Sequence, residues 1–337
     1  MNKKRVVIVC PGRGSYTRET LGYLDNSPSY LKEYLSNFDK KRLALKLQSI
    51  SELDKESFRA KTHMIGINAS PLIYACSLSD FLFINKDKFE IVAICGNSMG
   101  WYTALALGGA LTIQNGYDLI QKMGSLTQQK GDGGQIIYPI INEEWVIDDE
   151  KRKYLYTEIK KYNLHISIYL GGYVVIGGAQ ESLDKILKIL PKVDKYPFQI
   201  PYHSAFHTIL LNSITQLAMD SVDKEIFSMP KIPLIDGDGS IWSPWSSSLS
   251  GLYRYTLNHQ VINTYNFSSS INVAIKEFCP DHLILLWPGN TLGGPVAQIL
   301  IEKNWNNLKS KNDFIDSQKQ DPFILSMGIA DQKQFLK

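Results

Sequence analysis

The chain has 337 residues, of which 44% are hydrophobic and 20% are charged, and its formal net charge is +3. This composition is that of a globular protein with a large apolar core. The charge is too small to predict a nucleic-acid partner, and no segment approaches the roughly 18 apolar residues that a membrane span needs. The cysteines lie in apolar surroundings without C-x-x-C spacing, so we expect buried thiols in a reducing cytoplasm.

The N-terminal half has the pattern of an α/β fold. Residues 5–10 form an apolar run that is too short for a signal peptide and that ends in the turn Pro11-Gly12-Arg13-Gly14-Ser15. A second apolar strand is expected at residues 89–95. The segments with helical periodicity are 29–83, 101–110 and 116–128. Strands that alternate with helices predict a parallel sheet.

The pattern changes between residues 131 and 200. Short segments follow one another in the order strand, helix, strand, strand, helix, strand, at 135–141, 149–162, 165–170, 173–176, 181–190 and 196–200. This is the ferredoxin-like order. We therefore predict a ferredoxin-like α+β subdomain of residues 131–200, inserted into a discontinuous core of residues 1–130 and 201–337. The polar segment after about residue 305 is not assigned to any element.

A nucleophile elbow is predicted in residues 89–102. The apolar run ends at Gly96, Ser98 and Gly100 follow, and a helix-like segment comes next. Strand, G-x-S-x-G and helix in this order form a turn so sharp that side chains at both glycines would collide with the flanking elements. The serine hydroxyl then lies at the start of the helix, near free N–H groups. Ser98 is the candidate nucleophile; the alternative is a small residue in a tight turn.

A serine nucleophile needs a base, and the chain has six histidines. His207 follows directly after the predicted insertion, in the segment Pro201 to Thr208. His203 is the competing candidate in the same segment. A lone histidine is more often packed in a core than catalytic, so position alone does not choose between them.

With these residues, the sequence resembles the malonyl-CoA:acyl carrier protein transacylase family, which includes the acyltransferase domains of polyketide synthases. The resemblance covers roughly residues 4–300 and lies in five motifs that occur in the order of the family. They are Pro11-Gly12-Arg13-Gly14-Ser15, Gly96 to Gly100, Ser204 to Thr208, Leu257-Asn258-His259-Gln260 with Asn263, and Trp287-Pro288-Gly289.

The resemblance implies an α/β-hydrolase-like main domain with a parallel sheet and an inserted ferredoxin-like subdomain. It also implies a two-step acyl transfer, in which Ser98 takes an acyl group from acyl-CoA and passes it to the phosphopantetheine thiol of acyl carrier protein. His207 would be the general base and acid, and the backbone N–H groups of Met99 and Arg13 would form the oxyanion hole. The backbone carbonyl at Gln260 would orient His207, although Gln260 is also typical of a polar helix residue.

No bound cofactor and no metal are expected. The segment Asp236-Gly237-Asp238-Gly239 has the acidic and glycine residues of a metal loop but lacks the other ligands of an EF-hand, so a glycine turn after a strand is the better interpretation.

The substrate pocket departs from the family. Malonyl-specific members carry an arginine on the helix after the elbow to pair with the free carboxylate, and here Met123 stands at that position. Lys122 is rotated by about 100° from it. Methionine suits an apolar acyl chain, and it is equally consistent with packing beside Leu119.

Two further departures lie close to the predicted nucleophile. Arg13 replaces the family's glutamine, and Asn97 replaces the histidine before the serine. Arg13 either supplies the missing charge to the pocket or points outward to the phosphates of CoA or phosphopantetheine. With Met123 and Phe206, these two residues are the predicted pocket residues.

The sequence therefore predicts an acyl-CoA:[acyl-carrier-protein] S-acyltransferase of fatty acid or polyketide biosynthesis, acting on malonyl or another short acyl group. The sequence leaves two alternatives to a transferase open. One is a hydrolase that clears acyl groups from carrier proteins, with water in place of the thiol. The other is a non-catalytic docking subunit for carrier protein, against which the presence of both Ser98 and His207 argues.

Overall fold

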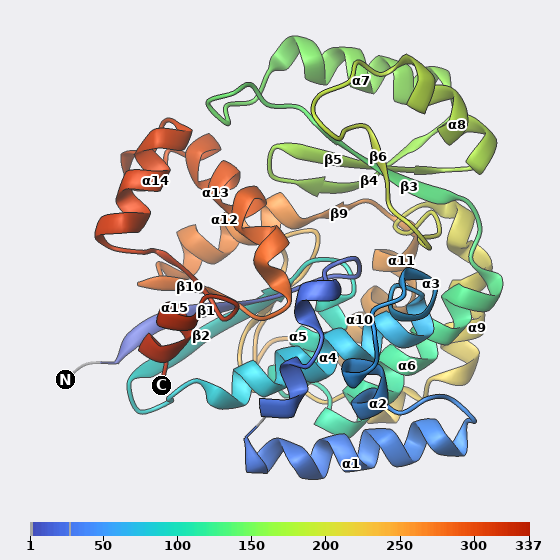
Figure 1. Ribbon diagram of the computed structural model, residues 1–337, viewed down its shortest axis with the longest axis vertical. Helices are drawn as coiled ribbons and strands as arrows, with labels where there is room; N and C mark the ends of the chain where they lie inside the picture. Colours follow the sequence, from blue (N-terminus) through green and yellow to red (C-terminus); the bar gives the residue numbers. More distant parts are fainter. Residues whose placement is uncertain (1–2, 27) are drawn as a thin grey trace.

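The computed structural model describes residues 3–26 and 28–337, and a six-stranded sheet runs through its larger part (Figure 1). The order of the strands is β11-β10-β1-β2-β7-β8. All neighbours are parallel except β7 and β8, which form an antiparallel pair. The strands are β1 (Lys4–Cys10), β2 (Phe89–Gly96), β7 (Leu234–Ile235), β8 (Ile241–Trp242), β10 (His282–Leu285) and β11 (Ile324–Ser326).

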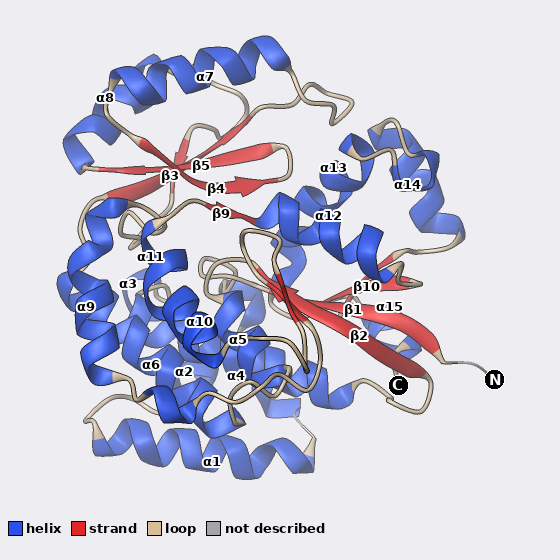
Figure 2. Ribbon diagram, turned by 180° about the vertical axis from the view of Figure 1, so that it is seen from behind, coloured by secondary structure: helices blue, strands red, loops and turns tan. Residues whose placement is uncertain are grey.

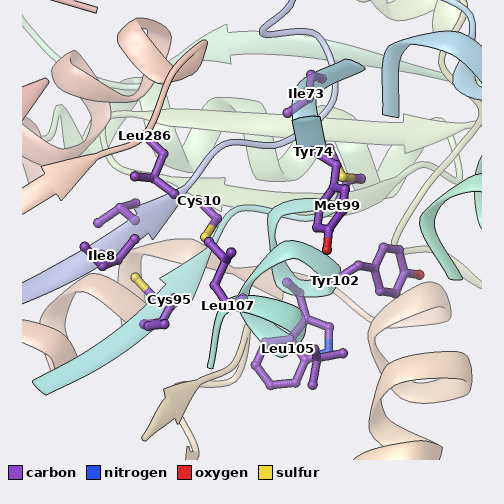
Figure 3. Packing of buried hydrophobic residues seen from close by; sticks show 14 of the residues in the cluster. Ile8, Cys10, Ile73, Tyr74, Cys95, Met99, Tyr102, Leu105, Leu107 and Leu286 are labelled. Atoms are coloured by element: carbon purple, nitrogen blue, oxygen red, sulfur yellow. The ribbon is translucent and has the colours of Figure 1, made fainter. Parts of the chain in front are cut away.

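The centre of this sheet is buried on both faces. Residues 6–10 of β1 have no exposed surface, because helices cover the sheet and a parallel sheet is stable only when both faces are covered (Figure 2). Figure 3 shows Cys10, Cys95 and Leu107 gathered where β1, β2 and α5 meet. The apolar run of residues 6–10 therefore has the buried position that its composition predicts.

Helices pack against the main sheet and against one another. The segment 29–83, for which the periodicity predicts helix, is divided into α1 (Ser29–Ala44), α2 (Ile50–Lys55), α3 (Ala60–His63) and α4 (Gly66–Phe83). The remaining helices of this part are α5 (Gly100–Leu107), α6 (Ile113–Lys130), α9 (Asn212–Ser221), α10 (Leu249–Arg254), α11 (Gln260–Ile262), α12 (Phe267–Phe278) and α13 (Gly293–Glu302). Nearly every residue of α4 is buried, and α1 lies outside it at the bottom of Figure 1. An all-round apolar helix such as α4 needs this covering.

A second sheet has the order β6-β3-β5-β4-β9. Its elements are β3 (Gly134–Pro139), α7 (Asp149–Lys161), β4 (His165–Leu170), β5 (Tyr173–Gly178), α8 (Gln180–Ile189), β6 (Phe198–Gln199) and β9 (Tyr265–Asn266). The four strands β6, β3, β5 and β4 pair antiparallel with their neighbours, as in a ferredoxin-like fold. Helices α7 and α8 cover the outer face of this sheet, at the top of Figure 1. A separate apolar cluster, which includes Ile136, Leu155 and Ile176, fills the space beneath these helices.

Strand β9 extends the second sheet with residues from outside 131–200. It pairs in parallel with β4, so Ile168 lies opposite Tyr265. The sheet is therefore completed by the part of the chain that follows the predicted insertion. The division into 131–200 and a discontinuous core of 1–130 and 201–337 stays a prediction, while the α/β fold with a ferredoxin-like part is the fold observed.

The C-terminal segment, which the sequence analysis leaves unassigned, belongs to the main fold. It contains α14 (Lys311–Gln320), β11 and α15 (Ala330–Phe335), and β11 lies in parallel beside β10. Leu336 is fully buried, and its carbonyl accepts a hydrogen bond from the N–H of Asn85 at 2.9 Å. A strand of three residues shows no periodicity, so the sequence offers no signal for it.

One expectation about the cysteines is wrong. Cys10, Cys76 and Cys95 are buried, but Cys279 is exposed. Cys279 ends α12 in the left-handed conformation, with φ of 41°, and so lies in a surface turn despite its apolar neighbours. Among the described residues, no helix combines the length and apolar character that crossing a bilayer requires.

Candidate active site

Ser98 lies at the sharp turn between β2 and α5. Its backbone has φ of +55°, in the left-handed region that residues other than glycine rarely adopt. A Cβ atom at Gly96 would lie 2.3 Å from the carbonyl of Gly100, and one at Gly100 would lie 2.3 Å from the carbonyl oxygen of Cys10. The two glycines of G-x-S-x-G are therefore required by close backbone contacts, as the motif predicts.

The structure brings Ser98 and His207 together although 109 positions separate them. Ser98 Oγ lies 2.7 Å from His207 Nε2. His207 is 4% exposed and also has a positive φ, of 56°. Two strained residues that contact each other are typical of a functional site, because only the surrounding structure can hold them in this conformation.

His207 is oriented by the main chain of Gln260. Its Nδ1 atom is hydrogen-bonded to the backbone carbonyl oxygen of Gln260. A carbonyl only accepts hydrogen bonds, so Nδ1 carries the proton and Nε2 keeps its lone pair toward Ser98. The side-chain amide of Gln260 donates to Tyr102 Oη at 2.6 Å and to the carbonyl of Thr256 at 3.0 Å. The carbonyl that faces His207 is thus held in place from the other side.

Burial sets the charge of the imidazole. It lowers the pKa of His207 to about 4, and the hydrogen bond to the Gln260 carbonyl opposes this change in part. His207 is therefore neutral near pH 7, which is the form that can accept a proton from Ser98.

His203, the competing histidine, has another environment. Its Nδ1 lies 2.8 Å from Gln135 Oε1, and its ring packs edge-on against Phe206. Burial lowers its pKa as well, with smaller contributions from Arg13 and His207. Of the two histidines in this segment, His207 is the one in contact with Ser98.

A cavity opens beside the Ser98–His207 pair. Its walls come from the loop after β1, helices α4 and α6, and the segments around residues 206 and 260. Of the predicted pocket residues, Arg13, Met123 and Phe206 line it, and Ile120 joins them on the apolar wall. Met123 and Ile120 lie on the same face of α6, which makes that wall apolar at the position where malonyl-specific relatives are expected to have an arginine.

Asn97 does not line this cavity, contrary to the expectation. It is 9% exposed, and its side chain lies against the turn after β1: a Cβ atom at Gly12 would be 3.2 Å from its Nδ2. Adjacent residues in a sharp turn point in different directions, so Asn97 points to the backbone of the neighbouring loop while Ser98 points to the cavity. Its N–H also donates to the carbonyl of Cys10 at 3.0 Å, which ties the elbow to the end of β1.

The residues expected to supply the oxyanion donors, Met99 and Arg13, belong to the elbow and to the loop that packs against it. Met99 precedes the first residue of α5, so its N–H has no partner within the helix. Arg13 follows Gly12, which packs directly against the elbow: a Cβ at Gly12 would lie 2.6 Å from the carbonyl oxygen of Asn97.

Sequence reasoning missed Tyr265, which belongs to β9. Its hydroxyl donates to the carbonyl of Gly96 at 2.6 Å, and its ring centroid is 5.2 Å from that of His207. Tyr265 therefore contacts both the elbow and the base. Tyr265 follows the motif that ends at Asn263 but is not part of it, and the pairing of β9 with β4 brings it here.

The acidic segment at residues 236–239 is a turn between β7 and β8. The Asp236 carboxylate accepts hydrogen bonds from the N–H groups of Asp238 and Ser240 and from Trp242 Nε1. These bonds occupy the oxygens of Asp236 with the turn itself, in agreement with the interpretation as a glycine turn.

Comparison with known proteins identifies the fold. No family model matches the chain. The chain is similar in structure to the acyl-carrier-protein S-malonyltransferase from Bartonella henselae, with a TM-score of 0.74 and 19% identity over 98% of this chain and 97% of that one. A type II polyketide synthase malonyl-transacylase, solved in complex with its acyl carrier protein, also has a TM-score of 0.74, with 16% identity over 98% of each chain. The fold is thus that of the S-malonyltransferases.

The sequence relationship is distant but spans both chains. The malonyl CoA-acyl carrier protein transacylase PksC of polyketide biosynthesis in Bacillus subtilis is 23% identical over 306 residues, which are 87% of this chain and 96% of that protein. These homologues and structural neighbours support a divergent member of the malonyl-CoA:acyl carrier protein transacylase family. The resemblance inferred from the five motifs is confirmed.

Proposed function

We propose that this protein is an acyl-CoA:[acyl-carrier-protein] S-acyltransferase that works through an acyl-Ser98 intermediate. The observation that carries the proposal is the 2.7 Å contact between Ser98 Oγ and His207 Nε2, with Nδ1 of the same imidazole bound to the Gln260 carbonyl. A neutral imidazole oriented in this way is ready to deprotonate the serine hydroxyl. The relationship to malonyl transacylases supports a thioester as the substrate.

The first step forms the acyl-enzyme. His207 Nε2 takes the proton of Ser98 as Oγ attacks the thioester carbonyl of acyl-CoA, and the carbonyl oxygen becomes an oxyanion. The N–H groups of Met99 and Arg13 stabilise this charge. The C–S bond then breaks, and the CoA sulfur receives the proton from His207.

The second step reverses the first with a different thiol. The phosphopantetheine thiol of acyl carrier protein gives its proton to His207 and attacks the carbonyl carbon of the Ser98 ester. The bond to Ser98 Oγ then breaks, His207 returns the proton to Oγ, and the acyl group is left as a thioester on the carrier. The transacylase solved with its acyl carrier protein has the same fold, which supports a carrier protein as the acceptor. Acyl-CoA is a substrate in this scheme, and no resident cofactor takes part.

Intact-mass measurement tests the proposal. After incubation with acetyl-, malonyl- and longer acyl-CoA, the protein is expected to gain the mass of one acyl group. Ser98→Ala abolishes the adduct. Ser125→Ala is the matched control, because its hydroxyl bonds to the carbonyl of Gln121 in its own helix, and it retains the adduct.

Adding a carrier protein separates the enzyme classes. A transferase loses its adduct only when holo-carrier protein is present, and the acyl mass then appears on the carrier. An adduct that decays equally fast without the carrier identifies a hydrolase. No adduct with any donor contradicts catalysis by Ser98 and favours a docking subunit.

A further inference from the structure

The side chain of Arg13 is partly exposed and lines the cavity beside Ser98. The guanidinium carbon lies 4.7 Å from the centroid of the Phe206 ring, and Nη2 donates to the carbonyl of Tyr202 at 2.5 Å. Arg13 lines the same cavity as Ser98 and Met123. The loop after β1 thus brings a cation to the pocket close to α6, whose wall is otherwise apolar.

This cation has no anionic partner in the described part of the chain. None of the ion pairs formed by residues 3–26 and 28–337 includes Arg13. Its Nε atom is buried and has no hydrogen-bond partner. Burial lowers the pKa of Arg13 to about 10, so the side chain is still charged at pH 7. Although Arg13 is partly exposed, a charge held against the protein with a buried Nε is stabilised by an anion that reaches it.

Helices α4 and α6 leave space for the guanidinium group of Arg13. A Cβ atom at Gly66, the first residue of α4, would lie 2.7 Å from Arg13 Nη1 and 3.0 Å from the carbonyl oxygen of Gly124 on α6. A Cβ at Gly124 would in turn lie 2.5 Å from the carbonyl oxygen of Gly66. These glycines let α4 and α6 approach closely and leave the space that Nη1 occupies. The guanidinium therefore ends next to Gly124, the neighbour of Met123.

We propose that Arg13 binds a carboxylate at the far end of the acyl group, and that this enzyme prefers acyl-CoA donors with a free terminal carboxylate. The inference rests on the proposed function and identifies its substrate class. Helix α6 has Met123 where an arginine is expected, and Arg13 in the loop after β1 supplies the positive charge instead. A carboxylate that accepts hydrogen bonds from the guanidinium compensates its charge.

The phosphates of CoA are a different source of negative charge, and the position of the guanidinium argues against them. The thioester must lie at Ser98, so the acyl group enters the cavity while the rest of CoA extends out of it. Arg13 packs against Phe206 and Gly66 within the cavity. Because malonyl-CoA and acetyl-CoA carry the same phosphates, comparing the two donors separates these sources.

The test is single-turnover loading of Ser98 by malonyl-CoA and acetyl-CoA, expressed as the ratio of the two kcat/KM values. Arg13→Gln keeps the backbone N–H but removes the charge, and it is expected to lower the malonyl-to-acetyl ratio about 100-fold. Arg13→Lys lowers the ratio less, because an ammonium retains charge but loses the planar fork. The double variant Arg13→Gln/Met123→Arg, which returns the cation to α6, recovers malonyl loading.

The possible outcomes are distinct. If Arg13→Gln lowers loading by both donors equally, or leaves the ratio unchanged, Arg13 does not recognise the acyl carboxylate and the inference is overturned. If Arg13→Gln does not fold, the ratio for Arg13→Lys decides the question in the same way. If the wild-type protein loads neither donor nor any other acyl-CoA on Ser98, the proposed function itself fails.

Discussion

His207 Nδ1 is hydrogen-bonded to the main-chain carbonyl of Gln260, so a neutral dipole orients the imidazole where many serine enzymes use a carboxylate. The main-chain carbonyl takes the position that an aspartate has in a Ser-His-Asp triad. It also means that no side-chain substitution at position 260 deletes the orienting group. A substitution of the Gln260 side chain can change only how firmly the backbone carbonyl of Gln260 is held.

The bond between Gln260 and Tyr102 is expected to position the base. Gln260→Ala and Tyr102→Phe each remove the 2.6 Å hydrogen bond between the two side chains. Loss of one buried hydrogen bond corresponds to about a tenfold decrease in the rate of Ser98 acylation. Because both variants remove the same bond, the double variant is expected to be no slower than the slower single variant. Stopped-flow release of CoA measures this rate, and independent effects that multiply would contradict the coupling.

The acylation rate is expected to be insensitive to pH in the neutral range. His207 acts as a base only when it is deprotonated, and its pKa of about 4 keeps it deprotonated at every pH well above that value. The rate constant for acyl-Ser98 formation should therefore be constant from about pH 5 to 8 and fall as the pH approaches 4. Quenched-flow mass measurements across this range test the prediction. An inflection near 6.5 would show that the imidazole is solvated in the working enzyme.

The same pKa makes folding stability depend on pH. The folded-state pKa of His207 lies below its ordinary value of 6.5, so the unfolded chain takes up the proton first as the pH falls. The free energy of unfolding is expected to decrease between pH 6.5 and 4. Urea denaturation at pH 7 and pH 5 should show a larger loss for the wild type than for His207→Ala. Equal losses would contradict the assignment to His207.

Two glycines at the starts of helices are expected to respond in opposite ways to alanine. A Cβ at Gly100 would lie 2.3 Å from the Cys10 carbonyl oxygen, whereas no atom lies within 4 Å of a Cβ at Gly294 on α13. Gly100→Ala is expected to destabilise the fold by about 3 kcal/mol or more, since backbone must shift. Gly294→Ala should be neutral or stabilise by up to about 1 kcal/mol. Thermal denaturation of the two variants compares them directly.

The C-terminal helix α15 is expected to stabilise the core through a buried ion pair. Lys333 Nζ lies 2.9 Å from Asp80 Oδ1, and the Asp80 side chain has no exposed surface. Burial raises the pKa of Asp80, and Lys333 opposes that change. Lys333→Met leaves the carboxylate without its cation and should cost about 3 kcal/mol near neutral pH. The double variant Lys333→Met/Asp80→Asn should recover part of this loss, and urea denaturation measures both.

Features that depend on neighbouring residues could be predicted from the sequence. The turn at Ser98 follows from Gly96 and Gly100 next to an apolar strand. A contact four residues away requires Gly96, whereas the contact that requires Gly100 is with Cys10 at the end of β1. The order of strands and helices in residues 131–200 follows from local periodicity. The ferredoxin-like strand order was therefore predictable, although β6 is shorter than the expected strand at 196–200.

Features that depend on distant pairing could not be predicted. Strands β9 and β11 are too short to show a pattern, and each exists because a longer strand offers it an edge. The pairing of β9 with β4 brings Tyr265 next to His207. Asn97 was expected in the pocket because it precedes Ser98 in the sequence. At a sharp turn, however, the side chains of neighbouring residues point in different directions.

The sequence by itself predicted the candidate nucleophile, the candidate base and the resemblance to the family, because each depends on a short motif of particular residue types. The tertiary structure alone decided where the side chain of Arg13 points. Its direction follows from the ring of Phe206, the carbonyl of Tyr202 and the gap at Gly66, which come from two parts of the chain that are far apart in sequence. Such a contact is a property of packing between elements, and no local pattern encodes it.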